Sequence, residues 1–262
     1  MEDYTYSLPE EVLNQVDGGC LFFPHCSDNY IEALFLFRYH ITDFWFVDPD
    51  YFTGGWSAAR TYRSFPRRHT RFKLQSKKVE GSEPERYRWN MNPGDPADQY
   101  ISVEPCALTE VYLDHEEGRT VTIRRIRAHP PEVFQTLPRL SVFYYCFNPY
   151  KNNVKFEEAE EWLVPGATSG GQPVGWFDRV LDKLADKALI VTDGLHLSIR
   201  EGPYSELRRT FGQTLLSRGR GMSEAQAFRD EKGRDFRCVG YSYPGDMGPV
   251  LIWQVTRPPS IL

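Results

Sequence analysis

Apolar and polar residues follow one another along the first fifty positions in a pattern that predicts a strand, a helix and a second strand. Residues 20–24 form an apolar run, residues 30–38 are amphipathic, and residues 44–47 are apolar again. A helical spacing of apolar residues between two short apolar runs is typical of a βαβ unit. The strands of such a unit are parallel, so their carboxyl ends lie at the same edge of the sheet.

The rest of the chain predicts further strands and helices. Two nearly continuous apolar runs, 140–146 and 188–192, are typical of strands that are buried on both faces. Helices are predicted over residues 8–16, 130–134, 156–162, 176–187, 204–216 and 224–232. Ser223 can cap the last of these helices, and Gly233 would end it.

Two pairs of strands are expected to form hairpins. Residues 108–113 and 120–126 flank a polar turn that ends in Gly118. Residues 236–243 and 250–256 flank a turn that is rich in proline and glycine. We therefore expect one domain over residues 1–262, with an irregular insertion at about 51–127 that contains a basic stretch and a β-hairpin.

This order of elements predicts the α/β class: a mainly parallel, Rossmann-like sheet with helices on both faces and a C-terminal antiparallel hairpin. It resembles the class I S-adenosylmethionine-dependent methyltransferases, whose parallel sheet ends in a reversed C-terminal hairpin. The resemblance is one of topology and leaves out the N-terminus and the insertion. It implies that the chain binds S-adenosylmethionine, or another ligand that contains a nucleoside, and that it transfers a methyl group.

In these methyltransferases a glycine-rich loop after the first strand approaches the cofactor. The matching residues here, 24–29, contain no glycine, and side chains at every position restrict close approach of the backbone. The resemblance implies that His25, Ser27, Asp28 and Asn29 bind the cofactor. The alternative for this loop is that Ser27 or Asp28 only caps the following helix.

Acidic residues follow two of the other predicted strands. A carboxylate at Asp48 can accept hydrogen bonds from both ribose hydroxyls of a nucleoside, as an acid at the end of a second strand does. Asp50 competes for this role, and a solvated or capping acid is the alternative. Asp193 follows the run at 188–192 and is a further cofactor-binding candidate, although Asp193-Gly194 is also a common turn sequence.

Asn148-Pro149-Tyr150 follows the strand predicted at 140–146. It resembles the motif by which amino-methyltransferases of nucleic acids hold a target nitrogen, which implies that Asn148 and Tyr150 are catalytic. The family's pattern has a second proline before the aromatic residue, whereas Tyr150 directly follows Pro149 here. A simple turn is the alternative.

The segment 60–78 is basic and predicts a second kind of ligand. Its Lys and Arg residues are interleaved with aromatic residues, and no acid interrupts residues 51–79. Positive charges bind phosphates and aromatic rings stack on bases. The alternative function is therefore a non-catalytic protein that binds nucleotides or nucleic acid, with Arg60, Arg63, Arg67, Arg68 and Arg71 as the nucleic-acid-binding residues. A solvated loop that offsets acidic surface elsewhere is the alternative.

Composition excludes several other classes. The net charge is −5, and no apolar run is long enough to form a membrane helix. The five scattered cysteines contain no CxxC pair, which argues against a structural zinc site and suits a reducing cytoplasm. The acidic N-terminus is unlike a signal peptide.

A metal-dependent hydrolase that uses His25, Asp28, Asp193 and His196 is a further alternative.

Overall fold

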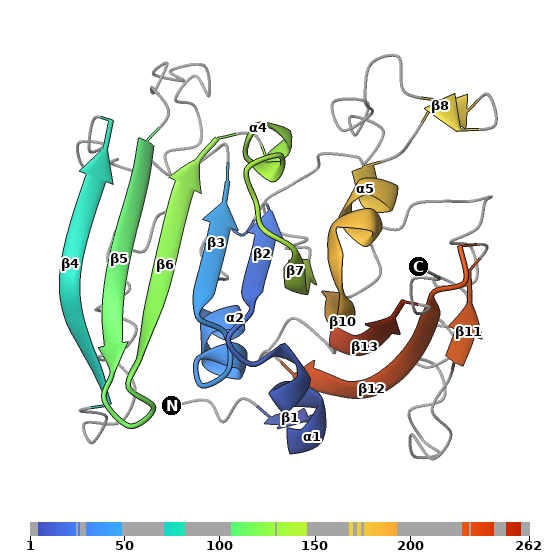
Figure 1. The fold of residues 1–262 in the computed structure, drawn as a ribbon, viewed down its shortest axis with the longest axis horizontal. Helices are drawn as coiled ribbons and strands as arrows, with labels where there is room; N and C mark the ends of the chain where they lie inside the picture. Colours follow the sequence, from blue (N-terminus) through green and yellow to red (C-terminus); the bar gives the residue numbers. More distant parts are fainter. Residues whose placement is uncertain are drawn as a thin grey trace, which may run out of the picture.

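Eleven strands form one mixed sheet that is parallel at its centre and antiparallel on both flanks (Figure 1). The computed structural model describes residues 5–24, 26, 30–48, 71–81, 106–128, 130–145, 168–169, 172–173, 176–192, 227–230, 232–243 and 250–257. The strands of the sheet are β1 (Thr5–Ser7), β2 (Cys20–Pro24), β3 (Asp43–Val47), β4 (Phe72–Glu80), β5 (Cys106–Asp114), β6 (Arg119–Arg127), β7 (Leu140–Tyr145), β10 (Leu184–Thr192), β11 (Ala227–Arg229), β12 (Asp235–Tyr243) and β13 (Val250–Thr256). A separate pair consists of β8 (Thr168–Ser169) and β9 (Gln172–Pro173).

The centre of the sheet is made of the apolar runs, because strands covered on both faces need apolar side chains on both. Five strands lie side by side and parallel, in the spatial order β6, β3, β2, β7, β10. The four strands expected to be mutually parallel, those near 20–24, 44–48, 140–146 and 188–192, are all among them. The spatial order runs from β2 through β3 to β6 in one direction and from β7 to β10 in the other. It therefore reverses between β2 and β7.

The sheet as a whole corrects the predicted fold class. Six of its ten strand pairings are antiparallel. The described α-helices are short, at most eight residues: α1 (Glu10–Leu13), α2 (Tyr30–Phe37), α4 (Pro130–Phe134) and α5 (Trp176–Lys183), with the 3₁₀ helix η1 (Asn14–Val16). The prediction of a mainly parallel, Rossmann-like sheet with helices on both faces is therefore wrong. The physical reason is that the segment expected to be an insertion is part of the main sheet. Its strand β6 joins β3 through a parallel pair, and β5 and β4 continue the sheet through antiparallel pairs.

Individual elements also differ from their predictions. Residues 227–229, predicted as part of a capped helix, form the strand β11 on β12, where Arg229 binds Asp235 across the pair at 2.7 Å. The helix predicted over 176–187 ends at Lys183, because the strand β10 begins four residues earlier than expected. The C-terminal hairpin of β12 and β13 is confirmed. The helices predicted over 156–162 and 204–216 lie outside the described residues.

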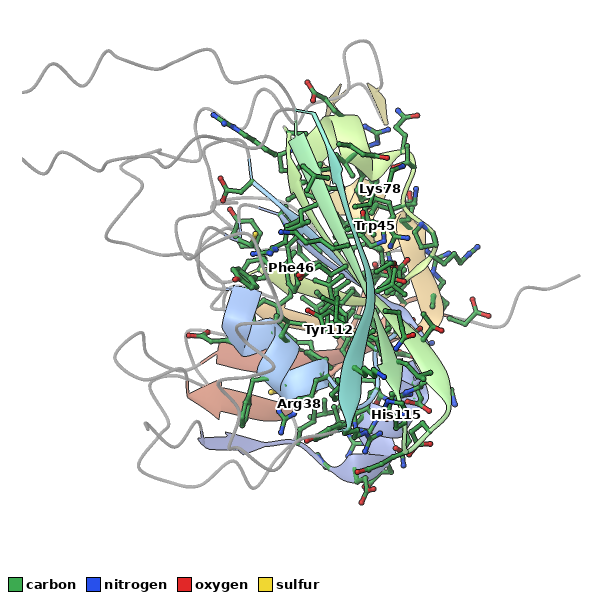
Figure 2. All side chains as sticks on the ribbon, turned by 90° about the vertical axis from the view of Figure 1, so that its left-hand side faces the viewer. Arg38, Trp45, Phe46, Lys78, Tyr112 and His115 are labelled. Carbon is green, nitrogen blue, oxygen red and sulfur yellow. The ribbon has the colours of Figure 1, made fainter. Side chains whose placement is uncertain are left out.

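Alternation along the strands divides the core into two layers. One layer lies between the sheet and α1 with α2, and the other lies between the sheet and α4 with α5. Phe46 belongs to the α2 layer, and Trp45 points to the opposite side, as Figure 2 shows. Beyond the reach of these helices, the edge strand β4 is exposed at every residue after Phe72.

The residue before β2 has no room for a side chain. A Cβ atom on Gly19 would lie 2.0 Å from Ser141 Oγ and 2.4 Å from Ser141 Cβ. Ser141 belongs to β7, so the backbone at the start of β2 touches a neighbouring strand here. This close approach requires glycine, although the backbone angles of Gly19 do not.

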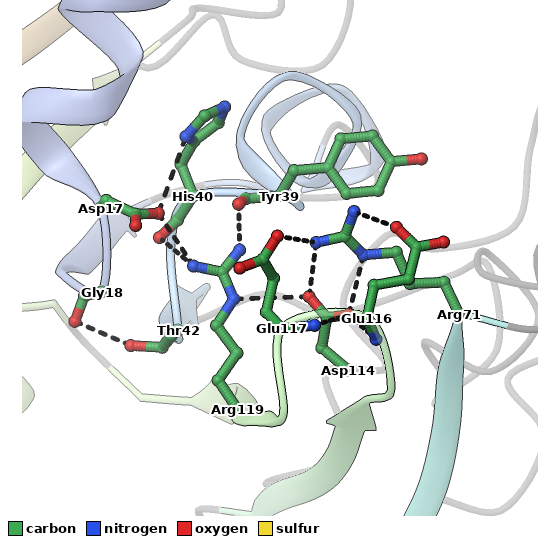
Figure 3. Close-up of polar contacts among 10 residues, drawn as sticks. All are labelled: Asp17, Gly18, Tyr39, His40, Thr42, Arg71, Asp114, Glu116, Glu117 and Arg119. Carbon is green, nitrogen blue, oxygen red and sulfur yellow. Dashed lines mark hydrogen bonds and ion pairs between the residues drawn. The ribbon is translucent and has the colours of Figure 1, made fainter.

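A buried carboxylate joins segments that are far apart in the sequence (Figure 3). Asp114 accepts two hydrogen bonds from Arg71, at 2.8 and 2.7 Å, one from Arg119 at 3.4 Å, and two from the backbone N–H groups of Glu116 and Glu117. Arg119 also binds Asp17 at 2.8 Å and donates to the carbonyl oxygen of Tyr39. The network therefore ties the β5–β6 turn to the start of β4 and to the loop before β3.

Replacing Asp114 by Asn should destabilise the fold by about 3–5 kcal/mol, because Arg71 and Arg119 would lose a buried anion. Burial alone would raise the pKa of Asp114, but the hydrogen bonds from Arg71 and the backbone, with the charge of Arg71, hold the pKa below its ordinary value. The unfolded chain therefore takes up the proton first as the pH falls. The contribution of Asp114 is complete above about pH 4 and is lost below it.

Urea unfolding of wild type and Asp114→Asn at pH 7 and pH 3 measures this difference. The gap between the two proteins should shrink at pH 3. Asp186→Asn, which alters an exposed carboxylate, is the matched control. A gap that stays constant with pH would show that the charge of Asp114 is unimportant.

Candidate functional site

The carboxyl ends of β2, β3 and β6 meet at one edge of the sheet, and buried polar groups gather there on the face that α2 covers. In open sheets with parallel strands, ligands bind outside this edge, at the point where the strand order reverses. The reversal here lies between β2 and β7. We therefore define the candidate site by the described polar residues at this edge, which are Tyr30, Asp48, Glu110, Arg125 and Arg127.

Arg125 is the centre of this site and has no exposed surface at all. Its Nη1 donates to the hydroxyl of Tyr30 at 3.2 Å, and its Nη2 lies 3.7 Å from Oε2 of the equally buried Glu110. The guanidinium also lies over the Tyr30 ring, 5.3 Å from its centre. Tyr30 in turn packs on Phe46, the cross-strand neighbour of Arg125, with ring centres 5.4 Å apart.

Burial sets the electrostatics of Arg125. It lowers the pKa of the guanidinium, while the nearby Tyr30, Glu110, Tyr112 and Cys26 oppose that change. A guanidinium stays protonated in proteins nevertheless, so a full positive charge lies inside the core. Such a charge interacts strongly with any anion that reaches this low-dielectric environment.

Asp48 lies directly after β3 and is only 5% exposed. Its backbone N–H donates to the carbonyl oxygen of Ile126 at 3.0 Å, so β3 and β6 remain paired up to this residue. Because Val47 pairs with Ile126, Asp48 and Arg127 come next on the two strands. Both follow the alternation that places Phe46 and Arg125 on the α2 face.

Glu32 is a second unusual group and lies in the first turn of α2. Its Oε2 is shielded from solvent and has no hydrogen-bond partner among the described residues. Burial raises the pKa of Glu32 to about 7. A carboxyl group with such a pKa can give and take a proton near neutral pH, which is the property of a general acid or base.

Of the residues predicted to bind the cofactor, the structure describes only Asp48. The rest of the predicted site, which comprises His25, Ser27, Asp28, Asn29, Asn148, Tyr150 and Asp193, lies outside the described residues. Asp50 and His196, named as alternatives, also lie outside them. The prediction that these strand-end groups share one site is therefore untested.

Of the arginines predicted to bind nucleic acid, Arg71 alone is described, while Arg60, Arg63, Arg67 and Arg68 are not. The side chain of Arg71 is 13% exposed, and it binds Asp114 and Glu116 at 2.7 Å and lies 3.5 Å from Glu117. Its charge is thus neutralised by carboxylates of the β5–β6 turn. This leaves Lys73, Lys77 and Lys78 of β4 as the exposed cations in the described part of the segment.

Arg125, Glu110 and Arg127 were not among the predicted site residues, although the sequence contains a signal for the first two. Val121, Ile123 and Arg125 occupy inward positions of β6, and Leu108, Glu110 and Tyr112 occupy those of β5. In each strand one charged residue interrupts an apolar alternation. Two such interruptions of opposite sign, on strands that form a hairpin, indicate a buried polar pair.

Three further features of the described residues bear on the other predictions. No group of three or more His, Cys, Asp or Glu residues in this part of the chain could hold a metal ion. Within the same residues, no helix is both long and apolar enough to cross a membrane. Cys20, Cys26 and Cys238 are buried and form no disulfide among the described residues, and burial raises the pKa of the Cys20 and Cys238 thiols.

Comparison of the chain with protein families, with curated proteins and with solved structures gave no match.

Replacing Glu110 by Ala should destabilise the protein by about 3–5 kcal/mol, because it removes a carboxylate beside the buried charge of Arg125. The double variant Glu110→Leu/Arg125→Met should recover most of this loss, since apolar residues of similar volume need no ionic partner. Chemical denaturation of the two variants and the wild type measures both effects. If the double variant is no more stable than the single one, the pair does not behave as an ionic unit.

The raised pKa of Glu32 predicts an unusual dependence of stability on pH. The unfolded chain ionises this group near its ordinary pKa of 4.5, whereas the folded chain holds the proton until about pH 7. Stability should therefore fall as the pH rises through this interval, by on the order of 1–3 kcal/mol. Glu32→Gln should match the wild type at pH 4 and exceed it at pH 8, as measured by thermal unfolding. Equal stability of the two proteins at pH 8 would contradict the shift.

Proposed function

We propose that this protein binds a nucleoside-containing ligand at the carboxyl ends of β2 and β3, where Asp48 accepts hydrogen bonds from the ribose. One observation carries the proposal: Asp48, a buried acid, directly follows β3. β3 lies next to β2, and the order of the parallel strands reverses on the other side of β2. Loops on the two sides of such a point diverge, which leaves room for a ligand between them.

The surroundings of Asp48 suit this role. The hydrogen bond from the Asp48 backbone N–H to the carbonyl oxygen of Ile126 fixes the backbone from which the side chain extends. Burial strengthens each hydrogen bond that the carboxylate accepts. A carboxylate has two oxygens and can receive both hydroxyls of one ribose. Asp48 also has contacts within the protein, so a ligand would join an existing polar arrangement.

S-adenosylmethionine is the ligand that we propose to test first. When bound, this cofactor supplies an activated methyl group. The position of β13 supports the resemblance to class I methyltransferases, because this reversed strand lies between β10 and β12. The roles proposed for Asn148 and Tyr150, and for the loop at 25–29, rest on the resemblance alone. A cytoplasmic location is part of the same proposal, and the absence of a disulfide among the described cysteines supports it.

Nucleic-acid binding through the segment 60–78 is a second candidate, which one observation favours. The edge strand β4 exposes Lys73, Lys77 and Lys78, although Lys78 pairs with Glu80. Exposed lysines are also a common protection of an edge strand against unwanted pairing. Fluorescence titration with single-stranded oligonucleotides at rising salt separates the two roles, because phosphate contacts weaken steeply as counterions compete.

Replacing Asp48 by Ala should weaken the binding of S-adenosylmethionine at least ~10-fold, because two hydrogen bonds to a charged group, each of about 1.5–3 kcal/mol, are lost. Isothermal titration of the wild type, of Asp48→Ala and of the surface control Asp186→Ala measures the effect. Circular dichroism shows whether each variant is folded, and Asp48→Asn replaces the alanine variant if it is not. The absence of binding to the wild type at millimolar S-adenosylmethionine, S-adenosylhomocysteine and adenosine would refute the proposal.

A further inference from the structure

We infer that the ligand beside Asp48 carries a phosphate on its ribose, and that Arg127 binds this phosphate. The inference rests on the proposed function, because Asp48 would hold the same sugar. It adds the chemical class of the ligand, a nucleotide rather than an uncharged nucleoside.

The first argument is the position of Arg127. It is the last residue of β6, and the pairing of Val47 with Ile126 makes it the neighbour of Asp48 across β3 and β6. Adjacent strands lie about 4.8 Å apart, so a carboxylate and a guanidinium on such neighbours can reach two groups of one sugar. In nucleotide-binding α/β sheets, an arginine near the ribose is also the group that accommodates a phosphate on this sugar.

The second argument is that the Arg127 side chain is unsatisfied. Its Nη1 is shielded from solvent and has no hydrogen-bond partner among the described residues. Arg125 and Arg257 also have shielded nitrogen atoms without a hydrogen bond, but each still donates through the rest of its guanidinium, Arg125 to the Tyr30 hydroxyl and Arg257 to two carbonyl oxygens. For Arg127 no hydrogen bond is found among the described residues. Leaving a charged donor buried without an acceptor is costly, so such a group in a folded protein calls for an explanation. A ligand anion supplies the acceptor.

The third argument is the local charge. The candidate site has two cationic side chains, Arg125 and Arg127, and two anionic ones, Asp48 and Glu110. Glu110 lies 3.7 Å from Arg125, whereas no described carboxylate forms an ion pair with Arg127. The positive charge of Arg127 is therefore not paired within the described structure. An anion in this place is attracted, whereas a further cation is repelled.

The geometry of the ligand group follows from the chemistry of arginine. A guanidinium presents parallel N–H donors and binds a phosphate with two hydrogen bonds at once, while the ammonium of lysine is a single point of charge. Asp48 would accept from the ribose hydroxyl that the phosphate leaves free. The two side chains together would distinguish a phosphorylated ribose from a ribose without phosphate.

Isothermal titration with adenosine, its 2′-, 3′- and 5′-monophosphates, S-adenosylmethionine and inorganic phosphate tests the inference. We expect at least one monophosphate to bind about 10- to 100-fold more tightly than adenosine, as a hydrogen-bonded charge pair allows. Arg127→Gln should abolish this difference, so that the monophosphates bind this variant no more tightly than adenosine does. Arg127→Lys should restore only part of it. Arg237→Gln, which removes an exposed arginine of β12, is the matched control for net charge.

The outcomes separate the inference from the proposed function. Equal affinities for adenosine and all three monophosphates would overturn the phosphate site and leave nucleoside binding intact. Binding of inorganic phosphate that depends on Arg127, without any binding of adenosine, would support the anion site and refute the nucleoside. An equal loss in Arg127→Gln and Arg237→Gln would show an effect of overall charge and overturn the site. No binding of any of these compounds would overturn both proposals.

The thermal stability of the ligand-free protein is an independent test of the role of Arg127. Because Arg127 has no partner in the described structure, Arg127→Gln should leave the melting temperature of the ligand-free protein unchanged or slightly raised. A clear decrease would mean that Arg127 holds the fold together, and the argument from an unsatisfied donor would fail.

Discussion

The arrangement of the sheet depends on the network around Asp114. Strands β3 and β6 are parallel neighbours with no short connection, so nothing in the local sequence sets their register. Arg119, at the amino end of β6, constrains this register, because it binds Asp17 and the carbonyl oxygen of Tyr39 near the start of β3. Arg124 of β6 adds an ion pair with Asp43 of β3. A shift of one residue would turn every side chain of β6 to the other face. These contacts at one end of the two strands therefore help to make Asp48 and Arg127 neighbours at the other end.

The two edges of the sheet carry polar groups of different kinds. At the amino ends of β3 and β6, Asp114, Arg71 and Arg119 satisfy one another with short hydrogen bonds, which is typical of groups that stabilise a fold. At the carboxyl ends, Arg127 and Glu32 each have a shielded atom without a partner among the described residues. At the amino ends, His40 Nδ1 also has no hydrogen bond among the described residues, but it lies 3.7 Å from a carboxylate oxygen of Asp17. Because buried polar groups without a partner call for an explanation and a ligand can supply the partner, Arg127 and Glu32 favour the carboxyl edge as the functional one.

The sequence predicts the central strands well and the flanks poorly, for identifiable reasons. Apolar runs such as 20–24 and 140–146 can only be buried, and their strands were found where expected. The strand β4 has mostly polar residues on both faces because it is an exposed edge, so it gives no periodic signal. Ser223 and Gly233 are plausible ends of a helix, but the pairing of β11 with β12 prevails over such local preferences. In the site, Asp48 was recognisable from its place after a strand. Arg125 and Glu110 become meaningful only when the register shows that both side chains point inward.

The contact at Gly19 has a consequence for the history of the chain. A side chain at Gly19 would overlap Ser141 of β7, and its Cβ would lie 2.9 Å from the carbonyl oxygen of Val16. Any change at Gly19 therefore demands a change at Ser141 together with a small shift of the backbone. Positions coupled in this way change together during evolution or do not change at all. Diverged relatives should therefore retain a glycine just before β2 and a small residue at the second position of β7, even after their overall sequence similarity has faded.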